Sequence, residues 1–179
     1  MLRAVLTATI FLLPAIAVAQ DVKIDFDKAF DFSTVKTYAI KIGTPWGNNL
    51  GERRALEEMD QEISSKGWKK VDEGQANIIV LLHGATQTKR TASTMYTGGM
   101  GGYGYRGYGG MGMGSSSTVV NEYTVGTLVV DMFDAKTKNL VFRGIAEDEL
   151  SDNPEKNKKK LEKASTKMFK EFPPTAKAK

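Results

Sequence analysis

The sequence predicts an α+β domain, a two-layer sandwich in which an antiparallel-rich sheet of about six strands carries two helices on one face. Three observations predict this class. Several strand patterns are joined by short turns, two segments show the apolar spacing of helices, and no series of alternating strands and helices is long enough for a doubly wound nucleotide-binding fold. Residues 20–174 are long enough to form this single domain around a core of their own.

The first strand patterns are short and alternate apolar with polar side chains. Residues 22–26 and 37–42 each place their apolar residues on one face, which is typical of half-buried strands. A short strand is predicted at 68–71. A longer one is predicted over 77–88, where the continuous apolar run 78–82 indicates burial on both faces.

Two long strands follow later in the chain, over 119–133 and 139–149. The residues between them, 134–138, have the composition of a turn, so the two strands are expected to form a hairpin. Asp131 and Asp134 flank this hairpin turn, and we expect both carboxylates to accept hydrogen bonds within it.

Two segments have the patterns of helices. The first is predicted over 52–66, where apolar residues recur every three or four positions, and Gly67 is its expected left-handed stop. The second begins at Pro154, after Asp152 or Asn153 as the capping residue. Its expected core stripe consists of Leu161, Ala164, Met168 and Phe172.

Residues 1–19 have the order of a secretory signal peptide: a short basic start, an apolar run, and the small-residue exit Ala17-Val18-Ala19. A membrane anchor is the alternative, but the apolar run is shorter than the roughly 20 residues that cross a bilayer. We therefore expect cleavage near Ala19 and export to the periplasm or the medium. The tail 175–179 is expected to be disordered.

The chain has no cysteine. This excludes disulfides, thiolate nucleophiles, cysteine-ligated zinc and iron–sulfur clusters. An N-terminal cysteine for lipid attachment is also missing, so we expect the exported protein not to be lipidated. The formal net charge of +4 is too small to indicate a nucleic-acid partner, and no later segment has the sequence of a membrane span.

A glycine-rich segment, 97–114, separates two of the predicted strands. It contains ten Gly, three Tyr and three Met, and burial of so few side chains does not offset its conformational entropy. We expect a mobile loop at the tip of a hairpin. Matches to the glycine fingerprint of dinucleotide-binding proteins occur in it by chance, because glycine is dense and no helix follows.

Two ligand hypotheses attach to this loop. Met100, Met111 and Met113 carry thioethers that suit Cu(I), and His83 is a further candidate ligand near the base of the loop. The competing interpretation is a hairpin tip whose methionines are adaptable apolar contacts. The loop also offers stacking area and one charge to a protein or a sugar, through Tyr103, Tyr105, Arg106 and Tyr108.

A stripe of lysines follows the second predicted helix at four- and three-residue spacing: Lys156, Lys160, Lys163, Lys167 and Lys170. This spacing places the ammonium groups on one side of the helix. A solvated helix face is the simpler interpretation. Contact with anionic headgroups or envelope polymers is the more specific one.

Nothing in the sequence indicates a catalytic centre or a cofactor. His83 is the single histidine, which disfavours a histidine-based triad and a multi-histidine zinc site. Its position late in an apolar strand favours a hydrogen-bonded structural role. The serine-nucleophile and phosphate-loop motifs of known enzyme classes are missing from the sequence. We therefore expect no enzymatic activity and assign no catalytic residues.

Several short motifs occur in a characteristic order. They are Phe30-Asp31-Phe32-Ser33, Ala76-Asn77-Ile78-Ile79-Val80, Gly126 to Asp134, Leu140 to Ala146, and Phe172-Pro173-Pro174. In this order the chain resembles the bacterial family named domain of unknown function 4136. The resemblance implies an α+β envelope protein, often a lipoprotein, with no assigned activity. This chain departs from the family in lacking the lipidation cysteine, in Phe142 where Trp is common, and in Asn77 where Asp is usual.

The sequence is thus best interpreted as an exported envelope protein that acts as a non-enzymatic binding or structural module. Its expected partner is an envelope protein, a glycan or an anionic surface. A periplasmic Cu(I)-handling or stress-related protein that uses the methionine-containing loop is the alternative. A hydrolase is a third class, and with one histidine and no cysteine its site would consist of carboxylates.

Deleting residues 97–114 in favour of a short turn is expected to leave the fold intact. Loop-closure entropy changes slowly with loop length, so the shorter connection should be neutral or slightly stabilising. We expect a melting temperature no lower than that of the parent, measured by calorimetry. Loss of cooperative unfolding would instead show that the loop belongs to the scaffold.

Overall fold

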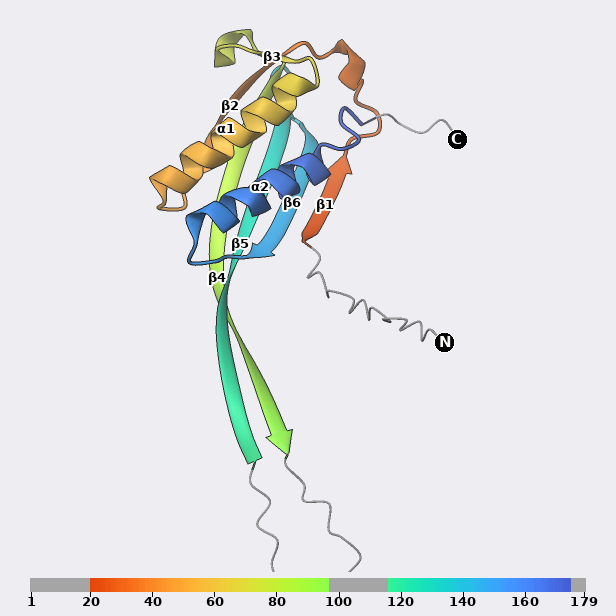
Figure 1. Cartoon of the computed structure of the whole chain (residues 1–179). Coiled ribbons are helices and arrows are strands. Elements are labelled where there is room, and N and C mark those ends of the chain that lie inside the picture. The colour runs from red at the N-terminus through yellow and green to blue at the C-terminus, as the bar shows by residue number, and fades with distance from the viewer. Residues whose placement is uncertain (1–19, 97–115, 175–179) are drawn as a thin grey trace, which may run out of the picture.

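The computed structural model describes residues 20–96 and 116–174, which form six strands, two α-helices and two short 3-10 helices (Figure 1). The predicted signal peptide (1–19), the glycine-rich loop (97–114) and the tail (175–179) lie outside these residues. Within the described part, no helix is both long and apolar enough to cross a membrane.

The strands of the described residues form one mixed sheet. They are β1 (Asp21–Phe26), β2 (Thr37–Thr44), β3 (Lys69–Lys70), β4 (Ile78–Tyr96), β5 (Ser116–Asp134) and β6 (Leu140–Glu149). Their order is β1-β6-β5-β4-β2-β3, in which β2 is parallel to β3 and β4 and all other neighbours are antiparallel. The predicted α+β class with about six strands is confirmed. The parallel pairs arise because a helix carries the chain from β2 to its neighbours.

The first helix, α1 (Asn49–Ser65), begins before the predicted start at Glu52. Asn48 is its cap, because the Asn48 side chain accepts a hydrogen bond from the backbone N–H of Gly51 at 3.0 Å. The predicted stop is confirmed. Gly67 has a φ of 90°, a left-handed conformation that glycine adopts without strain.

The second helix, α2 (Pro154–Met168), begins where the sequence predicts. Asn153 is the cap, and its side chain accepts a hydrogen bond from the backbone N–H of Glu155 at 2.9 Å. Phe172 was expected on the core stripe of this helix but follows its last turn. It is nevertheless 6% exposed, because its ring packs edge-on against Trp68 at a centroid distance of 5.0 Å.

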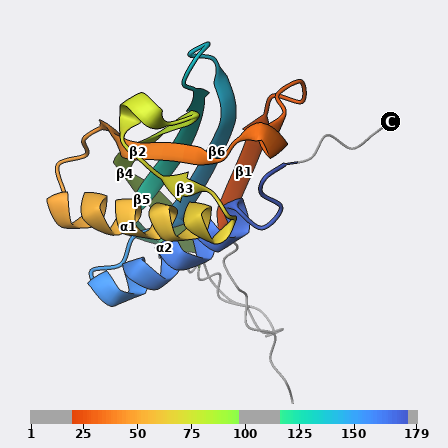
Figure 2. The ribbon, with the colours of Figure 1, turned by 90° about the horizontal axis from the view of Figure 1, so that it is seen from above.

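The core lies between the sheet and the helices, which run side by side in Figures 1 and 2. α1 packs on β2, β3 and β4, whereas α2 packs on β1 and β6. Both helices and four of the strands supply large side chains that are fully buried, among them Tyr38, Met59, Ile63, Ile78, Leu82, Met132, Phe142 and Met168. Phe142, where the resembling family commonly has Trp, stacks on Phe169.

One amide side chain joins the start of β4 to the start of β2. The Asn77 Oδ1 atom accepts hydrogen bonds from the backbone N–H groups of Lys36 at 3.0 Å and Thr37 at 3.2 Å. In return, Thr37 Oγ1 accepts a bond from the Asn77 N–H at 3.0 Å. Asn77 therefore fixes the register at which these two parallel strands begin.

The buried side chain of Tyr38 joins β2 to α1. Its hydroxyl donates to the Asp60 Oδ1 atom at 2.6 Å, and the Ser64 hydroxyl lies 2.8 Å away. Lys70 pairs with the other Asp60 oxygen at 3.1 Å. Burial, followed by the bond to Asp60, raises the pKa of Tyr38 to about 12. In the folded protein the Tyr38 side chain is therefore the neutral phenol.

β4 and β5 are longer than predicted, and together they extend beyond the rest of the sheet (Figure 1). The pairing of β4 with β2 ends at His83, and the pairing of β5 with β6 ends at Val125. From the Lys89–Tyr123 pair to the Tyr96–Ser116 pair, the two strands continue as a two-stranded ribbon. We call residues 89–96 and 116–123 the ribbon.

Raising the pH from about 9 to about 12 should reduce the stabilisation that the Tyr38 hydroxyl provides. The pKa of about 12 in the folded protein lies above the unfolded value near 10, so the contribution is complete below pH 10 and is lost as the pH rises. We expect the difference in unfolding free energy between the parent and Tyr38→Phe to fall by about 2 kcal/mol, measured by urea denaturation. A difference that does not change with pH would contradict this role.

Candidate functional site

A pocket of about 170 Å³ lies where β4 and β5 leave the sheet, between the sheet and the two helices. Its lining is mainly apolar and includes Trp46, Gly84, Gly126, Leu128, Ala146 and Leu161. Small residues leave room for the pocket, because the helix residues that line it include Gly51, Ala55 and Ala164. We call it the hairpin-base pocket.

The indole of Trp46 forms one wall of this pocket. A Cβ atom at Gly84 would lie 2.3 Å from the Trp46 Cδ2 atom, so only glycine lets the ring approach the strand this closely. The loop that carries the indole is fixed by a bond from the Trp46 backbone N–H to Glu52 Oε1 at 2.9 Å. The Trp46 wall is therefore held from both the sheet and α1.

Leu150 forms a second wall, packed on another glycine. A Cβ at Gly126 would lie 2.8 Å from the Leu150 Cδ2 atom. The segment after Leu150 is tied to α2, because Ser151 N–H donates to Asn157 Oδ1 at 2.8 Å and Asn157 Nδ2 donates to the Ser151 carbonyl at 2.7 Å. Both walls are thus built before any ligand arrives.

The polar rim of the pocket is paired. Lys160 forms an ion pair with Asp148 at 3.0 Å and also donates to the Glu149 carbonyl at 2.6 Å. The Gln20 side-chain amide donates to the Lys160 carbonyl at 2.7 Å. The charges of Lys160 and Asp148 thus balance each other, and Glu147 also lines the pocket. The pocket consequently offers apolar surface with a hydrogen-bonded edge, which suits the capture of an apolar group.

A second polar cluster lies on the side of the sheet that faces away from the helices. Asp131 is 4% exposed and receives two hydrogen bonds from Arg143, from Nε to Oδ1 and from Nη2 to Oδ2, each of 2.6 Å. These bonds raise the pKa of Arg143. His83 Nε2 lies 3.8 Å from Asp131 Oδ2, and His83 Nδ1 is 2.9 Å from the Thr44 hydroxyl.

The predicted role of Asp131 in the hairpin turn is wrong. Its side chain points across the sheet to Arg143 on β6, because it lies on the strand before the turn begins. Asp134 does make the predicted turn bonds, accepting from the Thr137 hydroxyl at 2.7 Å and the Lys136 N–H at 3.1 Å. These bonds hold the pKa of Asp134 below its usual range.

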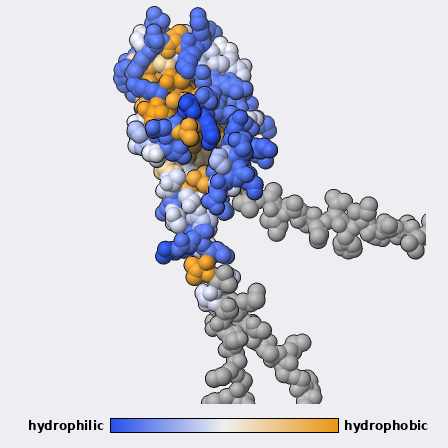
Figure 3. Space-filling view, turned by 60° about the vertical axis from the view of Figure 1, so that its left-hand side comes forward, coloured by the Kyte–Doolittle hydropathy of each residue, from blue (hydrophilic) through white to orange (hydrophobic). Residues whose placement is uncertain are grey.

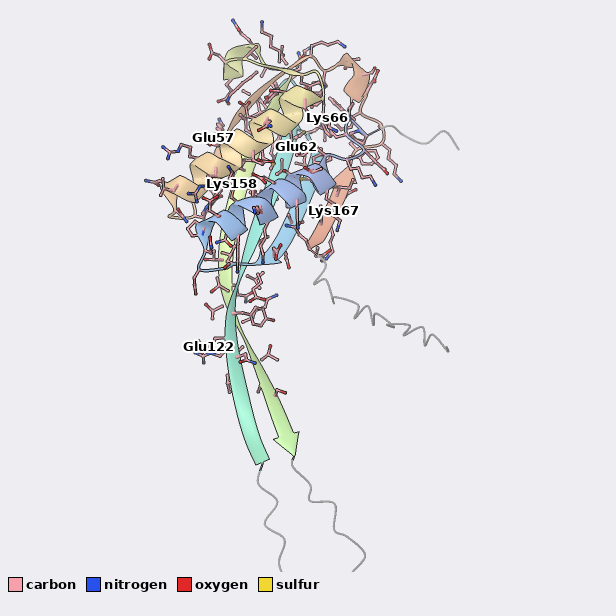
Figure 4. The ribbon with its side chains drawn as sticks, viewed as in Figure 1. Glu57, Glu62, Lys66, Glu122, Lys158 and Lys167 are labelled. Atoms are coloured by element: carbon pink, nitrogen blue, oxygen red, sulfur yellow. The ribbon has the colours of Figure 1, made fainter. Side chains whose placement is uncertain are left out.

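The predicted lysine stripe is divided between two environments. Lys160 belongs to the rim of the pocket, and Lys167 donates to the Gln20 carbonyl at 2.8 Å. Lys156, Lys163 and Lys170 are exposed. On the side of α2 that faces α1, hydroxyl groups bond to glutamates instead, as in the bond from Thr166 to Glu62 at 2.8 Å. Figure 4 labels Glu62 on α1.

The loop candidates lie outside the described residues: Met100, Met111, Met113, Tyr103, Tyr105, Arg106 and Tyr108. The Cu(I) hypothesis and the proposed aromatic contact of the loop therefore stay predictions. His83, the remaining metal candidate, is placed beside Thr44 and Asp131. Over residues 20–96 and 116–174, no group of three or more His, Asp or Glu side chains could hold a metal ion.

The hairpin-base pocket was missed by the sequence analysis, although one signal was present. An isolated glycine within a strand pattern often marks a position where another group approaches the backbone closely. Gly84 and Gly126 are such glycines. The group that approaches Gly84 is the indole of Trp46, which the sequence places in a turn. Only the register of β4 with β5 places these two glycines near each other.

The α+β sheet, with β2 parallel to its neighbours and two helices packed on it, is a fold shared with known proteins. Residues 22–174 match the family described as Domain of unknown function (DUF4136), and the chain belongs to this family. The resemblance inferred from the sequence motifs is thereby confirmed. No curated protein matches the chain.

Two solved structures are similar in fold. A DUF4136 family protein from Bacteroides thetaiotaomicron matches with a TM-score of 0.54 at 14% identity, over 88% of this chain and 98% of that one. A PDZ domain protein from Parabacteroides distasonis matches with the same TM-score of 0.54 at 14% identity, over 86% of this chain. This chain spans only 35% of the PDZ domain protein. At such identities the likeness describes the fold.

Gly84→Ala should displace the Trp46 indole, because the new Cβ would lie 2.3 Å from the ring. We expect a loss of about 1–3 kcal/mol in unfolding free energy, together with a changed tryptophan emission spectrum. Urea denaturation followed by fluorescence measures both. Gly74→Ala is the matched control, since nothing lies within 4 Å of a Cβ there. Equal effects of the two substitutions would refute the close packing of Trp46 on β4.

Proposed function

We propose that this chain is an exported, non-enzymatic binding module of the cell envelope, and that it holds an apolar group of its partner in the hairpin-base pocket. The observation that carries the proposal is the preformed apolar pocket between Trp46 and Leu150, each seated on a glycine of the sheet. Clefts of this kind, apolar with a few fixed polar groups at the edge, are the usual form of ligand sites.

The volume of the pocket limits what it receives. About 170 Å³ is close to the roughly 150 Å³ of an engineered apolar cavity that binds benzene. The pocket therefore has room for one six-membered ring or one branched apolar side chain. A partner protein that presents such a side chain, or a glycan that presents the apolar face of one sugar, fits this volume.

We propose that this chain has no enzymatic role. Two acidic residues line the pocket, Glu147 and Asp148, and Asp148 is paired with Lys160. Asp131 lies on the other side of the sheet from the pocket, and its buried carboxylate accepts two hydrogen bonds from Arg143. The carboxylates of Asp148 and Asp131 are both held by these contacts, whereas general acid–base catalysis uses a carboxyl group that can reach the substrate.

The proposed location and layer arrangement have separate support. Export is proposed from residues 1–19, whose basic, apolar and small-residue regions follow the order of a signal peptide. A two-layer arrangement is proposed because core residues alternate along the strands, as Val80 and Leu82 do on β4, and both helices lie along the sheet in Figure 2.

The pocket can be tested with p-cresol, a single ring with one hydroxyl. We expect titration of the chain from residue 20 onward to shift the NMR signal of the Trp46 indole N–H, with a dissociation constant on the order of 1 mM. Thr86→Phe should weaken this binding at least about tenfold, because Thr86 is exposed and lines the pocket, and a ring there would fill it.

Gln87→Phe is the matched control for this experiment. Gln87 is also exposed and follows Thr86 on the same strand, but its side chain lies on the opposite face of the sheet. We expect this variant to bind p-cresol as the parent does. The binding proposal is lost if the Trp46 signal does not respond to p-cresol, or if both phenylalanine variants weaken binding equally.

A further inference from the structure

The ribbon is a sheet of only two strands with no third strand beside it in the described part of the chain. β2 ends beside His83 and β6 ends beside Val125, so neither reaches it. A two-stranded ribbon is marginal in water on its own. The outer backbone edge of a long strand is also a template for pairing with another chain.

The ribbon has no core of its own to stabilise it. The side chains of residues 89–93 are exposed, as is Val120 at 57%. In Figure 3 the ribbon shows mostly pale and blue surface, with one orange patch toward the end farther from the domain. Its threonines, valines and tyrosines nevertheless favour extended structure. Partners along its edges would supply the stabilisation that burial does not.

Charge is divided between the two strands of the ribbon. Lys89 and Arg90 lie on β4, and residues 84–96 contain no acidic residue. Glu122 lies on β5, and residues 116–123 contain no basic residue. Arg90 and Glu122 are directly opposite in the register and form an ion pair at 2.5 Å, with side chains 72% and 52% exposed. Figure 4 labels Glu122 on β5.

This division favours one kind of edge pairing. If β4 of one copy lies beside β5 of the next in a similar register, Arg90 comes close to a second Glu122. If β4 lies beside β4, basic residues meet basic residues and repel each other. The complementary edges both belong to this chain, so a second copy is the partner that fits them.

We propose that copies of this chain associate through their ribbons, with the outer edge of β4 in one copy hydrogen-bonded to the outer edge of β5 in the next. Strand directions then alternate throughout, as they do within each ribbon. The contact is heterologous, and successive copies therefore form a ring or an open filament with every domain at the same end of the ribbons.

The cysteine-free chain permits a direct test by cross-linking. Thr91→Cys places one thiol on β4 and Asn121→Cys places one on β5, so neither variant can form a disulfide within a single chain. We expect a disulfide-linked dimer when the two variants are mixed and oxidised, and little product from either alone. Gln87→Cys, Lys89→Cys and Ser93→Cys, each mixed with Asn121→Cys, test whether the two strands pair in a shifted register.

Equal cross-linking of Thr91→Cys with itself would overturn the proposal in favour of a symmetric β4–β4 contact. No cross-link from any mixture, together with a monomer by analytical ultracentrifugation at about 100 μM, would overturn association altogether. Neither result bears on the p-cresol experiment, because none of the residues substituted for cross-linking lines the hairpin-base pocket.

Charge reversal provides an independent measurement on the same edges. Arg90→Glu and Glu122→Arg, each alone, should lower the association constant at least about tenfold, and the double variant should restore it to within about threefold. Arg53→Glu, an exposed reversal on α1, is the matched control and should leave association unchanged. If the double variant does not regain association although circular dichroism shows that all variants are folded, the β4-to-β5 contact is ruled out.

Discussion

The pairing of β4 with β5 is the constraint on which the rest of this structure depends. It runs without interruption from Ile78–Asp134 to Tyr96–Ser116, through the centre of the sheet and out beyond it. One register therefore sets three features at once. It places Gly84 and Gly126 near each other on the floor of the pocket, holds His83 beside Asp131, and aligns Arg90 with Glu122. Because side chains alternate along a strand, a shift of β5 by one residue would turn Gly126, Asp131 and Glu122 to the opposite face of the sheet.

The segments that the sequence predicted well are those in which local chemistry determines structure. Asn153 before Pro154 defines a helix start, and Gly67 defines a helix end, whatever packs around them. The end of β4 was less predictable, since its outer half is polar and is a strand only because β5 pairs with it. Asp131 was misinterpreted for the same reason, because its partner Arg143 belongs to the next strand and only the register brings them together.

The two sides of the sheet differ in how they treat polar groups. The side toward the helices is filled by large apolar residues except at the hairpin-base pocket, where small residues oppose small residues. The side away from the helices holds a buried carboxylate with two bonds from one guanidinium. Burying an unpaired charge would cost free energy, and the two hydrogen bonds from the guanidinium offset that cost. The first side is suited to receiving an apolar group, and the second stabilises the pairing of β5 with β6.

Asn77 has a consequence for the acid tolerance of the fold. Its amide oxygen accepts two backbone bonds at the start of β2, and an amide does not titrate. An aspartate in its place, the residue that the sequence resemblance leads one to expect, would accept the same bonds as a carboxylate with a lowered pKa. Its contribution to folding would then be lost as the pH fell through that pKa. With Asn77, this chain keeps the junction of β2 and β4 in surroundings acidic enough to protonate such a carboxylate.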